Sequence, residues 1–291
     1  MKLLRWSAIL PWLLALTAVL PVSAQQPPRL QFPESLDVPY VPTNQPAVEA
    51  MLRVANVGPN DVLIDLGSGD GRIAITAARV HGARALGVDL DPQRLKEAAE
   101  NLRGLPPAVA ERVTFRQQNI FETPLAEATV VTMYLLPRVN LLLRPRLFKE
   151  LKPGTRVVSH DFHMEEWRAD ITASVRGSGS TLYYWVIPAQ VAGRWDFTIA
   201  DPKGERRYPG EIKQAFQEVT LTLQDKGRPA NTFDTRLDGD RFSFVWIDEV
   251  DYNKRWRFEG RVAGEAIEGT VRGEGSSPRE PVPFRARRTG S

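Results

Sequence analysis

The chain has 291 residues, of which 42% are hydrophobic and 25% are charged, a balance typical of a folded protein with a sizeable core. The formal net charge of +3 is too small to indicate a nucleic-acid-binding surface, so we expect no nucleic-acid partner. Because the chain contains no cysteine, disulfides, thiolate metal sites and a cysteine nucleophile are excluded.

The first 24 residues have the organisation of a secretory signal peptide (1–24). Lys2 and Arg5 precede an apolar run over 6–20, and small residues follow where a signal peptidase requires them. The run is short for a helix that crosses a bilayer, so we expect export to the periplasm or medium. A membrane anchor that is not cleaved is the alternative. A lead-in rich in Pro and Gln, 25–45, follows.

Apolar runs and helical patterns then alternate over residues 46–188. The predicted strands cover 61–66, 85–89, 113–117, 129–134 and 156–159, and the predicted helices cover 47–54, 72–80, 92–102 and 140–151. Because these strands are apolar on both faces, they predict a doubly wound, mostly parallel, Rossmann-like α/β sheet. Two β-rich runs, 171–176 and 181–187, are joined by Gly and Ser residues and predict an antiparallel hairpin that ends the sheet.

A boundary near Pro188 introduces a second, β-rich domain over residues 193–288. Strands are predicted at 193–199, 218–224, 241–247, 255–261, 266–272 and 282–287, with a helix near 211–216. Short strands at even spacing predict a small antiparallel barrel or sandwich. Aromatic residues that alternate with polar ones predict its core: Trp195, Phe197, Phe242, Phe244, Trp246, Trp256 and Phe258. The opening Gly193-Arg194-Trp195 weakly resembles the Gly-x-Trp start of lipocalin-like barrels.

Three glycines follow the first predicted strand, in Asp65-Leu66-Gly67-Ser68-Gly69-Asp70-Gly71. Such a turn brings backbone N–H groups and a helix N-terminus towards a ligand. Arg72 stands where a dinucleotide-binding motif would have its third glycine, so the spacing is not that of a dinucleotide site. Asp89 ends the second strand about twenty residues further on, where a carboxylate can accept both hydroxyls of a ribose.

The acid-x-Gly-x-Gly-x-Gly spacing resembles the first motif of class I (seven-strand) methyltransferases, which depend on S-adenosylmethionine (SAM). The resemblance implies SAM as the cofactor. It also implies that Gly67, Ser68, Gly69 and Gly71 let the backbone approach the methionine part of SAM, while Asp65 helps to hold its ammonium group.

The same resemblance assigns residues after the second and third strands to the nucleoside part of SAM. Asp89 would bind the ribose, Asn119 would accept from the exocyclic amine of adenine, and Ile120 would lie against the adenine ring. The alternative for Asn119 is an ordinary loop residue. Asp91 precedes Pro92 and suits a helix cap better than Asp89 does.

Candidate catalytic residues follow the fourth and fifth strands. Tyr134 opens the run 134–137, which lacks the Asn/Asp-Pro-Pro-Tyr/Phe motif of many amino-methylating enzymes, and this argues against methylation of a nucleobase nitrogen. Tyr134 is still placed to face the transferred methyl group. His160 and Asp161 lie within 159–163, and a histidine there could deprotonate an incoming ammonium or hydroxyl. A structural role is the alternative for each residue, and we expect no metal site.

Four segments together resemble a branch of this fold that includes the mitochondrial protein-lysine methyltransferases of adenine nucleotide translocase and ATP synthase subunit c. They are the glycine motif, 134–137, 159–162 and Tyr40-Val41-Pro42-Thr43. In that branch the last segment lies over the SAM site, which implies that Tyr40 and Thr43 contact SAM. We therefore expect a SAM-dependent methyltransferase that acts on an amine, either a protein lysine or a small molecule. The alternatives are a small-molecule O- or N-methyltransferase and an exported binding protein that keeps the fold without catalysis.

Overall fold

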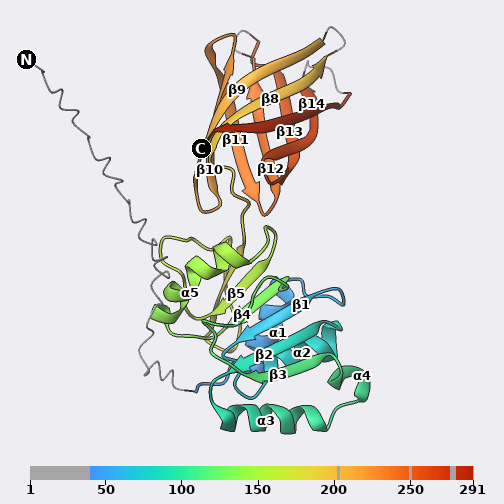
Figure 1. Cartoon of the computed structure of the whole chain (residues 1–291), viewed down its shortest axis with the longest axis vertical. Coiled ribbons are helices and arrows are strands. Elements are labelled where there is room, and N and C mark those ends of the chain that lie inside the picture. The colour runs from blue at the N-terminus through green and yellow to red at the C-terminus, as the bar shows by residue number, and fades with distance from the viewer. Residues whose placement is uncertain (1–39, 202–203, 249–250, 276–279, 291) are drawn as a thin grey trace, which may run out of the picture. The chain divides into compact units, whose positions relative to one another are not determined.

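The computed structural model describes residues 40–201, 204–248, 251–275 and 280–290. The predicted signal peptide and most of the predicted lead-in lie outside these ranges, so export stays a prediction. Within the described ranges, no helix is long and apolar enough to cross a membrane. The described chain folds into an α/β part followed by a β-barrel (Figure 1).

The α/β part is built on one sheet whose strands are β1 (Val62–Leu66), β2 (Arg84–Asp89), β3 (Val113–Gln117), β4 (Val130–Met133), β5 (Arg156–His160), β6 (Ile171–Ser174) and β7 (Thr181–Val186). Their order is β3-β2-β1-β4-β5-β7-β6. Strands β1 to β5 pair in parallel, whereas β7 runs antiparallel to both β5 and β6. The predicted mostly parallel sheet with a terminal hairpin is therefore confirmed.

Helix α1 (Gln45–Val54) precedes β1, and the helices α2 (Arg72–His81), α3 (Pro92–Arg103), α4 (Pro107–Ala110) and α5 (Pro137–Glu150) lie in the connections between parallel strands. Side-chain caps explain two of the starts, because Asn44 Oδ1 accepts from the backbone N–H of Ala47 and Asp91 Oδ1 accepts from that of Gln93. Helices α1 and α2 bury apolar residues in one core with β1, among them Met51, Leu52, Leu63 and Ile73. The predicted helix at 140–151 begins three residues earlier, at Pro137, where proline suits the first helical turn.

The barrel is closed and consists of β8 (Gly193–Asp201), β9 (Gly204–Ala215), β10 (Glu218–Asp225), β11 (Arg228–Asp238), β12 (Arg241–Ile247), β13 (Lys254–Ala263), β14 (Ala266–Gly275) and β15 (Val282–Gly290). Large aromatic side chains are buried inside it: Trp195, Phe197, Phe242, Phe244 and Phe258. The rings of Phe244 and Phe258 stack with centroids 4.3 Å apart. The predicted core is confirmed for these residues, while Trp246 and Trp256 are partly buried against it.

The packed interior makes a testable prediction about stability. We expect Phe244→Ala to lower the free energy of unfolding by about 3–5 kcal/mol, because it leaves a cavity among buried rings. The control is Phe233→Ala, whose side chain lies on the exposed face of the same barrel and should change stability by less than about 0.5 kcal/mol. Urea unfolding followed by tryptophan fluorescence measures both, and equal losses would contradict a packed interior.

The sequence prediction misses two barrel strands and assigns one helix wrongly. Residues 211–216, predicted to be helical, form the end of β9 and the turn into β10. The reason is that Ala215 pairs with Glu218, and Phe216 takes the positive φ of 58° that the tight turn requires. Strands β9 and β11 each contain a proline and bury few side chains, so their hydrophobic alternation is weak.

Candidate active site

The candidate site lies where the order of strands reverses, between β1 and β4. Here Leu66 pairs with Met133. The connection after β1 leads to β2 on one side, and the connection after β4 leads to β5 on the other side. In open α/β sheets this crevice at the carboxyl ends of the strands is the usual ligand site. The glycine turn follows β1 and Tyr134 follows β4, so the structure brings both predicted motifs to this edge.

The glycine turn is shaped for close approach. Gly67, Gly69 and Gly71 have φ values of 77°, 51° and 78°, in the left-handed region that favours glycine. A Cβ atom on Gly67 would lie 2.8 Å from the side chain of Leu135, and one on Gly71 would lie 2.3 Å from Phe115. Only glycine fits at these positions, because neighbouring side chains pack directly against the turn, which leads into the N-terminus of α2 where backbone N–H groups can meet a ligand.

Asp65 is the buried acid of this site. The residue is 1% exposed, and its Oδ1 accepts a hydrogen bond of 2.8 Å from Thr132 Oγ1. Among the described residues, neither Asp65 Oδ2 nor Ser68 Oγ has a hydrogen-bond partner. Burial raises the pKa of Asp65 to about 7. A buried carboxyl oxygen without a partner fits the ammonium group of SAM, since buried polar atoms are normally paired.

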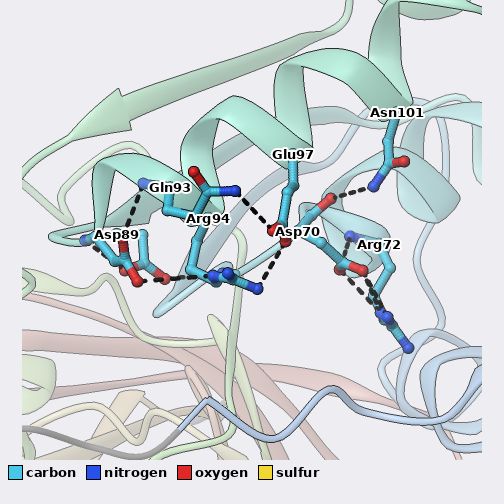
Figure 2. Close-up of polar contacts among 9 residues, drawn as sticks. Asp70, Arg72, Asp89, Gln93, Arg94, Glu97 and Asn101 are labelled. Atoms are coloured by element: carbon cyan, nitrogen blue, oxygen red, sulfur yellow. Dashed lines mark hydrogen bonds and ion pairs between the residues drawn. The ribbon is translucent and has the colours of Figure 1, made fainter.

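Asp89 is held in place at the end of β2. Its Oδ2 accepts from the backbone N–H of Gly69 at 2.8 Å, and its Oδ1 accepts from that of Asp91 at 2.9 Å. Figure 2 shows Asp89 beside the first turn of α3, while Asn101 at the other end of this helix donates to the carbonyl of Asp70. The carboxylate is thus fixed beside the glycine turn, as a ribose ligand would require.

Asn119 has a local partner. Its side-chain Oδ1 accepts from the backbone N–H of Phe121 at 2.9 Å and closes a turn after β3. The backbone N–H of Gln118 donates to the carbonyl of Asp89, which places this loop next to the predicted ribose site. An adenine contact through Asn119 would share the oxygen that closes the turn, and the contacts assigned to Asn119 and Ile120 stay predictions.

The segment before α1 is attached to the glycine turn. Arg72 donates from Nε to Asp70 Oδ1 at 2.9 Å and from Nη1 to the carbonyl of Thr43 at 2.8 Å. The Tyr40 ring packs against Gly69, and the guanidinium of Arg94 lies 4.4 Å from the ring centroid. Tyr40 therefore lies at the predicted SAM site.

The hydroxyl of Thr43 has a different partner from the one the resemblance implied. It lies 3.1 Å from His160 Nδ1, and both residues are buried. Thr43 thus contacts the glycine turn through its backbone, by way of Arg72, and the candidate catalytic residues through its side chain. A direct contact between Thr43 and SAM stays a prediction.

The three candidate catalytic residues form one cluster. The rings of Tyr134 and His160 have centroids 3.9 Å apart. Asp161 Oδ2 lies 3.4 Å from the hydroxyl of Tyr134, which donates to it, and 3.5 Å from His160 Nε2. His160 is 3% exposed, whereas a third of the Asp161 side chain is exposed. Asp161 and Tyr134 are therefore partly open to solvent, on the side that we call the entrance of the site, whereas His160 is buried beneath them.

Burial sets the protonation states in this cluster. It lowers the pKa of His160, although the Asp161 carboxylate acts in the opposite direction. It raises the pKa of Tyr134, and the charge of Asp161 raises it further. At neutral pH the imidazole is therefore neutral and the phenol keeps its proton.

Several polar contacts in the site had no signal in the sequence. Thr132 and Asp65 are 67 residues apart, Thr43 and Arg72 are 29 apart, and Thr43 and His160 are 117 apart. Each pair comes together only in the folded chain. The resemblance pointed to the segment containing Thr43, but not to its partner.

The fold and the site together define the class of protein. A doubly wound sheet with an antiparallel terminal hairpin carries a glycine turn, a buried unpaired acid before it and a fixed carboxylate after the next strand. This is a SAM-dependent methyltransferase.

Comparison with known proteins gives the family. A family model described as the ANTKMT methyltransferase domain matches residues 65–171. A protein-lysine N-methyltransferase of Saccharolobus islandicus is 45% identical over 153 residues, which cover 52% of this chain and 94% of that protein. The adenine nucleotide translocase lysine N-methyltransferase of Mus musculus is 32% identical over 56% of this chain and 74% of that protein. The chain belongs to this methyltransferase family.

Solved structures include a similar chain. An RNA methyltransferase from Salinibacter ruber, in complex with S-adenosyl-L-homocysteine, is 53% identical over 52% of this chain and 96% of that chain, with a TM-score of 0.49. The family model ends at residue 171, before the barrel begins at Gly193.

Proposed function

We propose that the protein methylates an amine, and that this amine is the side chain of a lysine in a protein. The observation that carries the proposal is the partly exposed carboxylate of Asp161, which lies beside Tyr134 at the same sheet edge as the SAM residues. A carboxylate at the entrance attracts a cationic ammonium and forms charge-assisted hydrogen bonds with it. The two relatives described above are named as lysine methyltransferases, which also supports lysine as the acceptor.

SAM, when bound, supplies an electrophilic methyl group. The residues of the chain then have to align the amine, take a proton from it and exclude water. Asp161 Oδ2 is placed to bind the ammonium and to accept one of its protons, which can leave to solvent through the exposed side of the carboxylate. The neutral His160 lies beneath Asp161, so it supports the carboxylate rather than meeting the amine itself.

Aromatic side chains suit the rest of a lysine. The rings of Tyr134 and Phe162 are stacked with centroids 6.0 Å apart, and both are partly exposed. Such faces pack against a methylene chain and attract a cation. A nucleobase would gain nothing from the anionic oxygen at the entrance, which favours an amine over RNA as the acceptor.

The substitution Asp161→Asn tests the proposed binding site for the amine. We expect kcat/KM for the acceptor to fall about 100-fold or more, because the charged partner of the ammonium is lost. Asn tolerates the positive φ of 62° at this position and can still accept from the backbone N–H of Thr181. Calorimetry should show SAM affinity within about threefold of the wild type. Transfer of label from radioactive SAM to a protein extract measures the activity.

The matched control is Glu165→Gln, which removes the same charge from an exposed residue of the same loop and should leave activity unchanged. Chemical acetylation of lysines in the extract should block labelling. Label that enters RNA, or only low-mass metabolites, would contradict lysine as the acceptor.

Export through residues 1–24 is part of the proposal. Cell fractionation and sequencing of the mature N-terminus test it independently of the chemistry. Protein in the cytoplasm with an intact N-terminus would contradict it.

A further inference from the structure

Hydrogen bonds run from the glycine turn as far as His160, which belongs to the cluster of Tyr134, His160 and Asp161. The carboxylate of Asp70 accepts from Arg72, as Figure 2 shows, and Arg72 Nη1 donates to the carbonyl of Thr43 at 2.8 Å. The hydroxyl of Thr43 lies 3.1 Å from His160 Nδ1, and His160 Nε2 lies 3.5 Å from Asp161 Oδ2. Thr43 therefore links the glycine turn, which would hold the methyl donor, to His160, which lies beside the residues that would hold the methyl acceptor.

The chemistry of these groups selects one arrangement of protons. A neutral imidazole carries one N–H and has one accepting nitrogen. The Asp161 carboxylate only accepts, so it favours the proton on the nearby Nε2. Nδ1 must then accept, and a threonine hydroxyl can donate to it. In this arrangement the protonated nitrogen is the one that lies 3.5 Å from the Asp161 oxygen that the proposed function assigns to the amine.

Packing alone does not account for a threonine here. Thr43 is 3% exposed, and a valine would fill the same volume without a polar atom. The backbone of Thr43 is fixed independently of its hydroxyl, since Asn44 caps α1 directly after it and Arg72 holds its carbonyl. His160 Nε2 is buried and has no hydrogen-bond partner within the described part of the chain, so the orientation of the ring depends on the contact at Nδ1.

We propose that Thr43 is a positioning residue: its hydroxyl holds His160 in the tautomer with the proton on Nε2 and thereby orients Asp161 towards the amine. The position of Thr43 depends in turn on the glycine turn, because Arg72 binds both the carbonyl of Thr43 and the carboxylate of Asp70. The inference rests on the proposed function for the role of Asp161, and it deepens that function. The acceptor site is complete only when residues 40–43 lie on the turn that binds SAM.

Histidine ¹⁵N NMR tests the inference directly, since the chain has only 3 histidines. His81→Gln and His163→Gln assign the signals of His160 in the full chain. In the wild type we expect an unprotonated Nδ1 and a protonated Nε2. Thr43→Val should replace this single tautomer with a mixture, and Thr43→Ser should restore it. Arg72→Lys should also shift the signals of His160, although it does not touch the ring, because lysine lacks the planar fork.

Kinetics provide the second measurement. Thr43→Val should lower kcat for the acceptor about tenfold to 100-fold while SAM affinity stays within about threefold, and Thr43→Ser should recover most of the loss. Thermal unfolding of each variant shows whether the fold is intact, and Thr43→Ala replaces Thr43→Val if it is not.

An unchanged tautomer in Thr43→Val, or a failure of Thr43→Ser to restore it, overturns the inference whatever the acceptor is. The expected spectra together with no methylation of lysine would support the positioning role and overturn only the proposed acceptor.

Discussion

Replacing Asp89 with alanine should abolish detectable binding of SAM in calorimetry, with a loss of affinity of at least about 100-fold. The carboxylate is already held by the backbone N–H groups of Gly69 and Asp91, so it meets a ligand with little rearrangement. Two ribose hydroxyls that donate to a charged acceptor contribute about 1.5–3 kcal/mol each. Both contacts are lost in Asp89→Ala, together with the side-chain bond to Gly69, while the backbone bonds of Gly67 and Ser68 to Val88 still join the turn to β2.

The neighbouring carboxylate provides the control for this change. Asp91 lies two residues further on and caps α3 through its side chain. Asp91→Ala should therefore cost about 1 kcal/mol of stability and leave SAM affinity nearly unchanged. Asp89→Asn, which keeps the shape of the side chain, should fall between wild type and alanine. Wild-type affinity in Asp89→Ala would show that SAM is bound elsewhere.

The affinity for SAM should also fall steeply as the pH is lowered below about 7. In the free protein burial raises the pKa of Asp65 to about 7, and the ammonium group of SAM requires the ionised carboxylate. Binding must then release a proton at low pH, which weakens affinity by about tenfold for each pH unit. Calorimetry in buffers that differ in ionisation enthalpy measures both the affinity and the released proton. Asp65→Asn should bind weakly at every pH and release no proton.

The same carboxyl should affect the stability of the protein without SAM. Its folded pKa is raised above the ordinary value of 3.8, so the folded state binds its proton more tightly than the unfolded chain does. The corresponding stability is complete below about pH 4 and is lost as the pH rises towards 7, by an amount on the order of a few kcal/mol. Asp65→Asn should flatten this dependence in urea unfolding. A wild-type curve that is flat over the same pH range would contradict the raised pKa.

Much of the α/β part could be predicted because its signals are local. Strands β1, β2, β4 and β5 contain short apolar runs, and most residues assigned to SAM lie at or directly after the ends of β1, β2 and β3. Thr43 shows where this reasoning ends. Its segment was recognised from a resemblance, but its partner His160 is 117 residues away and is brought to it by the position of β5 beside β4. Nothing in the neighbouring sequence specifies such a contact.

The barrel shows the same limit for strands. Strands β12 and β13 were predicted because buried aromatic residues such as Phe242, Phe244 and Phe258 alternate along them. Strand β9 buries Tyr208 and Ile212 among mostly exposed residues, and the second residue of β11 is a proline. Their hydrogen bonds to neighbouring strands, and not their side chains, define them.

The closure of the barrel affects the resistance of this chain to aggregation. An open sheet exposes edge strands that can pair with other chains and aggregate, whereas the described strands β8 to β15 satisfy one another around a ring. Buried phenyl groups fill the interior of the barrel, and the chain has no thiol to oxidise. Its fold therefore needs neither an oxidising compartment to form nor a reducing one to persist.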